Sequence, residues 1–543
     1  MTKVSTCREI CYKYCENEPR KYQNIAWNSF LDNINKNKIT LVRLPCGYGK
    51  TMIGLVPFMA QAVEEVWDIA PRLIYVLPMR TLANEVRDIA YRLVEKLALT
   101  DLLVVRTLHG EAPETPHLFS DISVTTLDSF LYNYARKVNI ESGLGDKHVD
   151  FSAGSIANSM VVFDEAHMYQ GGEIQVLGLV RQVIKYLVKT GIPVLIMTAT
   201  MPKVIRDFLF KEISYDDISF RDDEELNKRE YNVFLKSNDL LDDNINDVIS
   251  TLSYRKLLIV VNTVERAINL KNELDDYDSI LLHARMRNID RENRLRELKK
   301  RLKEGQVILI STQVCEAGLD LDFDTLITDM APADSLVQRI GRVARRGGKG
   351  TVIFYKPKSV APYENAIVDE TSKWIEAHAL EVDFSRFSGG GEAYGVQDFV
   401  DASWEPYRER LFKRSFSESE LFLRGKGLIS EPDLDFNVRG TDYVILVAPY
   451  DCEKSLLNGG ILKPREFNEC KFTVDFGIIK NYSEWIKDPH LRESRYMKLC
   501  FDKERKGYVV SHVDEVSPYQ SYLVNSFFYS NDVGLRRPEK YDV

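Results

Sequence analysis

A glycine-rich loop between an apolar run and a helical pattern constrains this chain more than any other feature. The run Ile39–Leu44 is typical of a buried strand, Pro45-Cys46-Gly47-Tyr48-Gly49-Lys50-Thr51 follows it, and the residues from Thr51 onward favour a helix. A strand, a glycine loop and a helix N-terminus aim backbone N–H groups at phosphate oxygens. Lys50 adds a positive charge, and the Thr51 hydroxyl is a suitable Mg²⁺ ligand. The stricter form of this loop has glycine where this chain has Leu44.

A pair of carboxylates, Asp164-Glu165, follows a second buried run, Met160–Phe163. Carboxylate oxygens are ligands that Mg²⁺ prefers. The pair therefore indicates a site for magnesium and water that works with the phosphate loop. An alternative without function, a glycine turn with a chance lysine, does not explain why both features are present.

Composition narrows the class of protein only broadly. The 543 residues have 44% apolar and 28% charged side chains, as in ordinary globular proteins, and allow about three or four domains. The net charge of −9 excludes a polybasic coat but not a local basic groove. No apolar run approaches the roughly 20 residues that span a bilayer, and the start of the chain lacks the apolar core of a signal peptide. We therefore expect a cytoplasmic protein that does not bind membranes.

Three of the eight cysteines recur at every fourth residue: Cys7, Cys11 and Cys15. A helix would place them along one stripe. The stripe is either part of a buried core or the beginning of a metal site. No fourth ligand lies nearby at a familiar spacing, which favours the core.

Strand-like runs alternate with helical patterns twice along the chain, which predicts an α/β protein with two tandem lobes built on parallel sheets. The acidic stretch from Asp216-Asp217 to Glu224-Glu225 is interpreted as a linker. After Ser388-Gly389-Gly390-Gly391 the tail becomes rich in Tyr and Phe and is expected to form a small α+β domain. The predicted domains are residues 1–212 with the phosphate loop, residues 213–387, and residues 388–543.

The second lobe carries its own polar motifs. Asp320 follows the predicted strand Val307–Ile310, and ligands of α/β sheets bind at the carboxyl ends of strands. In the segment Gln338–Gly347, Arg342 and Arg345 are three residues apart and share one face of a helix. They are suited to meet the γ-phosphate of a nucleotide.

Taken together, the motifs between about residues 19 and 346 resemble those of the superfamily 2 helicases. The resemblance implies two RecA-like lobes, with ATP and Mg²⁺ as cofactors. In the family's pattern Thr51 and Asp164 hold Mg²⁺, and Glu165 orients or deprotonates the attacking water. The positions that match ATP contacts are Gln23 at the adenine; Pro45, Cys46, Gly47, Tyr48, Gly49, Lys50 and Thr51 at the phosphates; Gly318 and Asp320 near the ribose; and Gln338, Arg342 and Arg345 as catalytic groups of the second lobe.

The same resemblance implies contacts with the backbone of a nucleic-acid strand. In this pattern Thr198-Ala199-Thr200 couples the state of ATP to the hold on the strand. His109 and His283 are either further strand contacts or structural residues, because a lone histidine at a strand end is often structural. The positions that match strand contacts are Pro78, Arg80, Thr81, Thr125, Thr126, Asp128, Asn262, Thr263, His283 and Thr312.

A narrower resemblance is to the helicase of type I CRISPR interference, through Val124–Phe130, Leu282–Met286 with Asp290-Arg291, and Gln338–Gly347. That family usually fuses a histidine–aspartate nuclease to the helicase. Here no histidine precedes an aspartate and the helicase motifs begin near residue 19, so the chain resembles the stand-alone helicase subunit. This implies 3′ to 5′ movement on single-stranded DNA, with a guide-RNA effector complex and a separate histidine–aspartate nuclease as partners.

Four other functions remain open from the sequence. They are a general superfamily 2 DNA-repair or RNA helicase, a double-strand translocase, a nucleotide-gated binding module without catalysis, and a self-contained nuclease. Lys50, Glu165 and Arg345 are present, which argues against the binding module. The missing histidine–aspartate pair argues against the nuclease.

Overall fold

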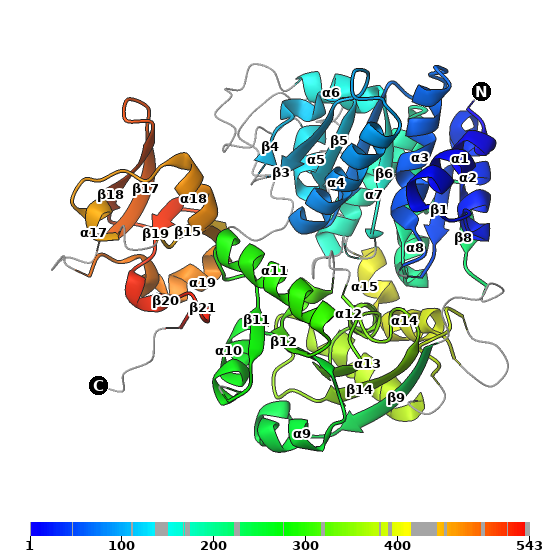
Figure 1. Cartoon of the computed structure of the whole chain (residues 1–543). Helices are drawn as coiled ribbons and strands as arrows, with labels where there is room; N and C mark the ends of the chain where they lie inside the picture. Colours follow the sequence, from blue (N-terminus) through cyan, green and yellow to red (C-terminus); the bar gives the residue numbers. More distant parts are fainter. Residues whose placement is uncertain are drawn as a thin grey trace. The chain divides into compact units, whose positions relative to one another are not determined.

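The computed structural model describes residues 2–45, 47–109, 112–135, 150–166, 168, 174–221, 229–274, 276–316, 321–378, 382–388, 394–413, 443–449, 453–489, 495–518 and 520–537. The chain divides into two compact units (Figure 1). The first contains Met1–Lys228, Pro332–Val337 and Asp369–Arg439; the second contains Arg229–Ala331, Gln338–Val368 and Gly440–Val543. The domain boundaries expected from the sequence stay predictions.

The first unit is built on an eight-stranded sheet of order β4-β3-β5-β2-β6-β7-β1-β8, in which only β4 runs antiparallel to its neighbour. Buried apolar strands flanked by helices explain this arrangement. The strands are β1 (Ile39–Arg43), β2 (Arg72–Leu77), β3 (Val105–His109), β4 (Ala112–Pro113), β5 (Ile122–Thr126), β6 (Ser159–Phe163), β7 (Val194–Thr198) and β8 (Tyr215–Ser219).

The helices of this unit include α1 and α2, which lie beside α3 (Figure 1). Gly54 lets α3 approach the sheet, because a Cβ there would lie 2.8 Å from the Tyr75 ring. The helices are α1 (Val4–Cys15), α2 (Lys21–Asn33), α3 (Lys50–Val63), α4 (Arg80–Lys96), α5 (Leu127–Tyr134), α6 (Asp150–Ala157), α7 (Ile174–Lys189), α8 (Lys203–Leu209), α14 (Val396–Trp404) and α15 (Arg408–Lys413); α13 (Asn365–His378) begins in the second unit.

One expectation for this sheet is wrong. The acidic pair Asp216-Asp217 is not a linker but part of β8, which pairs with β1. Arg43 neutralises Asp217, with Nη2 2.8 Å from Oδ2, and Lys38 pairs with Asp216. Charged residues are therefore tolerated in this edge strand.

The second unit contains a six-stranded, all-parallel sheet of order β11-β12-β10-β13-β14-β9. The predicted runs of the second lobe form its strands, and the edge strand β9 was not predicted because its burial alternates along a charged sequence. The elements are β9 (Arg229–Lys236), α9 (Ile245–Thr251), β10 (Lys256–Val260), α10 (Val264–Glu273), β11 (Ser279–Leu282), α11 (Asn288–Glu304), β12 (Val307–Ser311), β13 (Thr325–Asp329), α12 (Ala333–Ile340) and β14 (Gly348–Tyr355).

The tail adds a five-stranded mixed sheet of order β16-β15-β19-β17-β18 to this unit. Apolar clusters around Trp485 and around Met497 form two cores of this domain. The predicted fold class, two parallel-sheet lobes and a small α+β domain, is confirmed. The elements are β15 (Tyr443–Val447), α17 (Glu453–Leu457), α18 (Pro464–Cys470), β16 (Lys471–Asp475), α19 (Phe476–Asn481), β17 (Tyr496–Asp502), β18 (Gly507–Val513), β19 (Ser521–Leu523), β20 (Tyr529–Ser530) and β21 (Gly534–Leu535).

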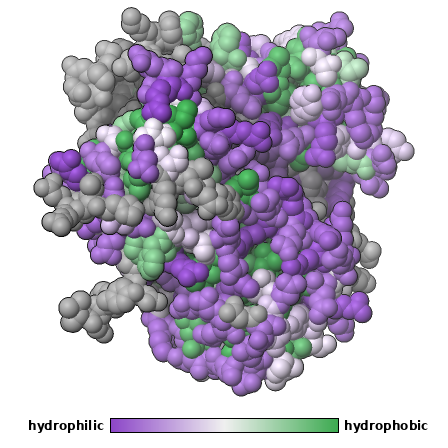
Figure 2. Space-filling model, turned by 60° about the vertical axis from the view of Figure 1, so that its left-hand side comes forward, coloured by the Kyte–Doolittle hydropathy of each residue, from purple (hydrophilic) through white to green (hydrophobic). Residues whose placement is uncertain are grey.

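The surface is mainly hydrophilic on the face drawn in Figure 2, where hydrophobic residues form small separate patches. Among the helices within the described ranges, none combines the length and the apolar character needed to cross a bilayer.

Candidate nucleotide and nucleic-acid sites

The phosphate loop lies between β1 and α3, as predicted. Gly47 and Gly49 have φ values of 82° and 90°, a backbone region that favours glycine. A Cβ on Gly49 would also lie 2.7 Å from the amide nitrogen of Gln23. Cys46 lies outside the described residues, and Pro45 is half-buried ahead of the turn. The loop therefore needs its two glycines for conformation and for the close approach of Gln23.

Gln23 ties the first turn of α2 to this loop. Its Oε1 accepts from the Arg20 backbone N–H at 2.9 Å, and its Nε2 donates to the Gly49 carbonyl oxygen at 3.2 Å. Arg20 donates to the carbonyl oxygen of Gly47 at 3.0 Å. Tyr48 turns its side chain into the core, where it is 1% exposed and its hydroxyl accepts from the backbone N–H of Tyr22. Tyr48 thus holds the loop in place through its ring.

The two carboxylates lie at the carboxyl end of β6. Lys50 Nζ is 3.6 Å from Glu165 Oε1 and donates to the Leu44 carbonyl oxygen at 3.2 Å. Tyr75 donates its hydroxyl to Asp164 Oδ2 at 2.7 Å. Tyr75 was not predicted as a site residue because it lies inside an apolar strand run. These contacts bring the predicted lysine and both carboxylates to one place.

Asp164 is nearly fully buried, and this burial is the main cause that raises its pKa to about 7, with the Glu165 charge as the next cause. A buried carboxylate with a raised pKa is typical of a site that a cation completes. Thr51, in the first turn of α3, offers a hydroxyl oxygen. Both groups are oxygen donors of the kind that Mg²⁺ prefers, so the donor set fits that ion.

Glu165 has a φ of 50°, an uncommon conformation for a residue with a side chain. Strained backbone of this kind is found at functional sites, where the surrounding structure holds it. Its backbone N–H donates to Asp164 Oδ1 at 2.9 Å, which fixes the strained turn.

In the second lobe, a buried arginine that the sequence analysis did not single out joins the predicted motifs. Arg339 is 0% exposed, and its Nε donates to Glu316 Oε1 at 2.8 Å. Its Nη2 donates to the side-chain oxygen of Asn262 at 3.1 Å and to the hydroxyl of Tyr363 at 3.1 Å. Arg339 lies within the segment Gln338–Gly347, in which only Gln338, Arg342 and Arg345 were predicted as functional residues.

The prediction that Arg342 and Arg345 share one face of a helix is wrong, because α12 ends at Ile340 and both arginines lie in the turn that follows it. Arg342 donates to the Glu316 carbonyl oxygen and is 6% exposed, and Gln338 is 4% exposed. The backbone N–H of Arg345 donates to Asp322 Oδ1 at 2.8 Å. Gly318 and Asp320 lie outside the described residues.

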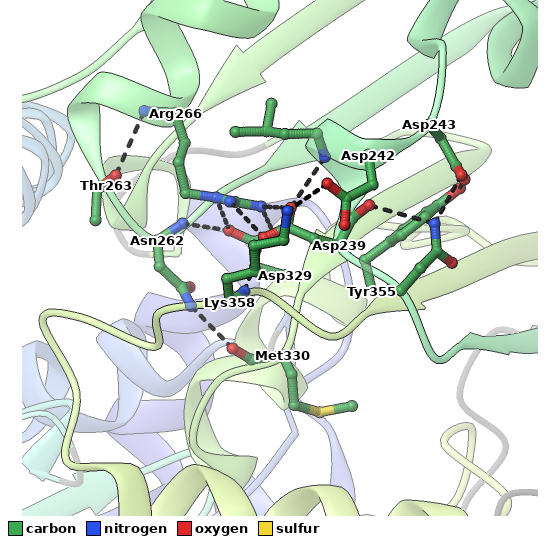
Figure 3. Close-up of polar contacts among 12 residues, drawn as sticks. Asp239, Asp242, Asp243, Asn262, Thr263, Arg266, Asp329, Met330, Tyr355 and Lys358 are labelled. Atoms are coloured by element: carbon green, nitrogen blue, oxygen red, sulfur yellow. Dashed lines mark hydrogen bonds and ion pairs between the residues drawn. The ribbon is translucent and has the colours of Figure 1, made fainter.

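Asn262 and Thr263 lie on a second ionic network (Figure 3). The Arg266 guanidinium lies between two buried carboxylates, 2.8 Å from Asp239 Oδ1 and 2.7 Å from Asp329 Oδ1. Asp329 accepts from the Asn262 backbone N–H at 3.0 Å, and Thr263 caps α10. These hydrogen bonds fix the positions of Asn262 and Thr263 just after β10.

The residues predicted to contact a nucleic-acid strand lie at or after the carboxyl ends of β-strands, where α/β sheets bind ligands. In the first lobe, Thr125 and Thr126 end β5 and pair with Val76 and Leu77 of β2. Thr125 is fully buried, and its hydroxyl donates to the Leu108 carbonyl oxygen at 2.7 Å. The other predicted contacts follow β2, β5, β10 and β12 directly: Pro78, Arg80, Thr81, Asp128, Asn262, Thr263 and Thr312.

The geometry of His283 counts against a strand contact. It is 0% exposed, and its Nε2 lies 2.9 Å from the Val533 carbonyl oxygen. Burial lowers its pKa to about 3, so it stays neutral. Gly534 follows with a φ of +73°, and a Cβ there would lie 2.6 Å from the Arg285 carbonyl oxygen. His283 therefore joins the tail domain to the second lobe, which is its structural interpretation.

Two of the three cysteines of the stripe, Cys7 and Cys11, lie in the apolar core of the first unit. Cys7 and Cys11 are buried, Cys15 is exposed, and all three are free thiols. Among the described residues no group of three or more potential ligands is placed to hold a metal ion.

Comparisons with known proteins find two family models that each match part of the chain. A DEAD/DEAH box helicase model matches residues 20–208, and the C-terminal model of the CRISPR-associated nuclease/helicase Cas3 matches residues 253–348. The CRISPR-associated helicase Cas3 of Thermoproteus tenax is 29% identical over 432 residues, which cover 75% of this chain and 72% of that protein. The Methanocaldococcus jannaschii relative, a putative CRISPR-associated nuclease/helicase Cas3, is 26% identical, covering 75% of this chain and 57% of that protein.

Solved structures share the fold. The crystal structure of T. fusca Cas3 has a TM-score of 0.66 at 17% identity, covering 94% of this chain and 70% of that chain. The DUF1998 helicase MrfA bound to DNA and AMPPNP has a TM-score of 0.56 at 14% identity, covering 95% and 73%. At these identities the likeness shows the architecture of two RecA-like lobes and no more.

Proposed function

We propose that the chain is an ATP-dependent superfamily 2 helicase of the Cas3 type, and that it moves 3′ to 5′ along single-stranded DNA during type I CRISPR interference. The observation that carries the proposal is the convergence of Lys50, Asp164 and Glu165 behind a phosphate loop. A lysine and two carboxylates beside a phosphate loop are the groups needed to hydrolyse a nucleoside triphosphate.

The residues of the first lobe divide the work of hydrolysis. Lys50 binds the phosphates and releases the Glu165 carboxylate, which then orients the attacking water and accepts its proton. Asp164 and Thr51 supply the oxygen donors for Mg²⁺, whose chemistry when bound is to neutralise charge on the phosphates. Arg342 and Arg345 are the cations that stabilise charge in the transition state, a role typically contributing roughly 10³ to 10⁵ in rate.

The strand is held by short polar side chains and backbone groups at the carboxyl ends of β2, β5, β10 and β12. Contacts of this kind reach the sugar–phosphate backbone and carry no base information. Binding is therefore expected to be independent of sequence.

The test of movement and polarity uses duplexes with a single-stranded tail on either the 3′ or the 5′ side. The proposal expects ATP-dependent displacement from the 3′-tailed duplex only, with Lys50→Ala as the inactive control. Displacement from the 5′-tailed duplex overturns the polarity. Triplex displacement without strand separation indicates a double-strand translocase instead.

The proposed partners are a guide-RNA effector complex, which exposes the single strand, and a histidine–aspartate nuclease on another chain. The support is the similarity to relatives named CRISPR-associated helicase Cas3 and putative CRISPR-associated nuclease/helicase Cas3. A binding assay with an effector complex already paired to its target, with and without the nuclease, tests this. Strand displacement without any binding to the complex supports a general superfamily 2 DNA-repair or RNA helicase.

A further inference from the structure

Part of the chain that follows the second lobe packs inside the first unit. We define the return segment as residues 382–388 and 394–413, which include α14 and α15. Arg408 Nη1 lies 3.0 Å from Asp207 Oδ2 of α8, and the Phe412 ring packs edge-on against Phe208. The boundary predicted after residue 387 falls inside the return segment, all of which belongs to the first unit.

The first contact lies behind the phosphate loop. Phe387 is 4% exposed and packs against Phe220, with ring centroids 6.3 Å apart. The Phe220 ring in turn contacts Tyr48 of the loop at 5.7 Å and Tyr22, next to Gln23, at 5.3 Å. The return segment thus completes the apolar cluster on which the phosphate loop rests.

The second contact lies directly after Thr198-Ala199-Thr200. Gln397 of α14 is 6% exposed and donates to the Met201 carbonyl oxygen at 2.9 Å. Asp401 accepts from the backbone N–H of Lys203 at 2.6 Å and from Gln397 at 2.9 Å. Asp401 therefore satisfies a free N–H at the start of α8, and both side chains hold the segment that leaves β7.

The third contact reaches α12. Trp404, at the end of α14, donates its Nε1–H to Asp334 Oδ1 at 3.3 Å, and both side chains are 6% exposed. Asp334 lies in the first turn of α12, whose last turn carries Gln338 and Arg339. One short helix is thus bonded at one end to the residues after Thr198-Ala199-Thr200 and at the other end to the helix that leads into Arg342.

We propose that α14 is a coupling helix of the motor, and that Gln397, Asp401 and Trp404 are positioning residues that link the Thr198–Thr200 segment to α12. A change in the Thr198–Thr200 segment on ATP binding shifts Met201 and Lys203, which are bonded to α14, and Trp404 passes that shift to Asp334. The inference rests on the proposed function, since it assumes that hydrolysis responds to a strand. It assigns the response to side chains outside the helicase motifs.

The experiment measures ATP hydrolysis by the full chain, with and without single-stranded DNA, for variants of the third contact. Trp404→Phe removes the N–H donor and keeps an aromatic ring. Asp334→Leu removes the acceptor, whereas Asp334→Asn keeps an oxygen in its place. We expect Trp404→Phe and Asp334→Leu each to lower DNA-stimulated kcat about fivefold to tenfold, with the KM for ATP within about twofold of wild type. Asp334→Asn is expected to stay close to wild type, and the double variant to be no slower than either single variant.

The matched control is Arg408→Met, which breaks the half-exposed ion pairs of the return segment with Asp207 and Glu405 and leaves the Trp404 contact intact. It is expected to behave as wild type. If Trp404→Phe unfolds at a markedly lower temperature, Asp334→Leu, Asp334→Asn and Gln397→Leu decide the question.

The proposal is overturned if kcat of Trp404→Phe and Asp334→Leu stays within about twofold of wild type, or if their effect falls on KM alone. It is also overturned if Asp334→Asn is as slow as Asp334→Leu, because the charge and not the bond would then matter. A wild-type chain that shows no DNA-stimulated hydrolysis rejects the proposed function itself, so the two failures are distinguishable.

Discussion

The carboxylate of Asp164 occupies a buried position beside another carboxylate, which is costly without a compensating cation. Lys50 and the Tyr75 hydroxyl compensate part of this cost. The remaining cost is visible as the raised pKa of Asp164. At the scale of single residues, the site is destabilised until a ligand that carries positive charge enters it.

This cost predicts how stability depends on pH in protein free of nucleotide and metal. The pKa of Asp164 rises from an ordinary 3.8 to about 7 on folding, so the folded state binds the proton more tightly than the unfolded state. The free energy of unfolding therefore falls as pH rises from about 4 to about 7. Asp164→Asn removes this penalty, and its melting temperature relative to wild type is expected to be higher at about pH 8 than at about pH 5.

Differential scanning fluorimetry in the presence of a chelator measures this difference. Asp101→Asn, at an exposed position, serves as the control and is expected to show no such dependence. A difference between Asp164→Asn and wild type that is the same at both pH values contradicts the assignment.

Secondary-structure elements of the second lobe are joined by buried ionic networks as well as by apolar packing. Arg339 connects α12 to the ends of β10 and β13 and to the residue that follows Cys315. Arg266 connects α10 to β13 and to Asp239 (Figure 3). Removing one partner from such a network leaves the other charges uncompensated, which costs more than the pair contributes.

Arg339→Met is therefore expected to lower the free energy of unfolding of the second lobe by about 3–5 kcal/mol. Lys349→Met, which removes an exposed ion pair with Glu230, is the control and is expected to change it by less than about 1 kcal/mol. Urea unfolding followed by the fluorescence of the chain compares the two. Equal urea midpoints for the two variants would show that the contacts of Arg339 do not stabilise the second lobe.

For the whole molecule, the sequence predicts the two sheets and the phosphate loop well because buried apolar runs and glycine turns are local signals. It does not predict β8, since the charges of Asp216 and Asp217 are neutralised by Lys38 and Arg43, which are distant in sequence. The burial of His283 depends on Val533, some 250 positions along the chain, and no local pattern indicates it.

In the proposed function both lobes contact the DNA backbone, so the affinity for single-stranded DNA is a property of the whole molecule. We expect the logarithm of the binding constant to fall linearly with the logarithm of the salt concentration, since each phosphate contact releases counterions. Fluorescence anisotropy with a labelled oligonucleotide of mixed sequence measures the slope. A flat response points to a protein-binding surface instead of a strand site.

The rate of ATP hydrolysis with and without single-stranded DNA tests the central claim most directly. The account predicts that DNA raises the rate of the wild-type chain and that Lys50→Ala lowers the stimulated rate roughly a hundredfold or more, since it removes a fixed charge from the phosphates. A Lys50→Ala chain that hydrolyses ATP as fast as wild type, or a wild-type rate that DNA leaves unchanged, contradicts the account of a nucleotide-driven motor.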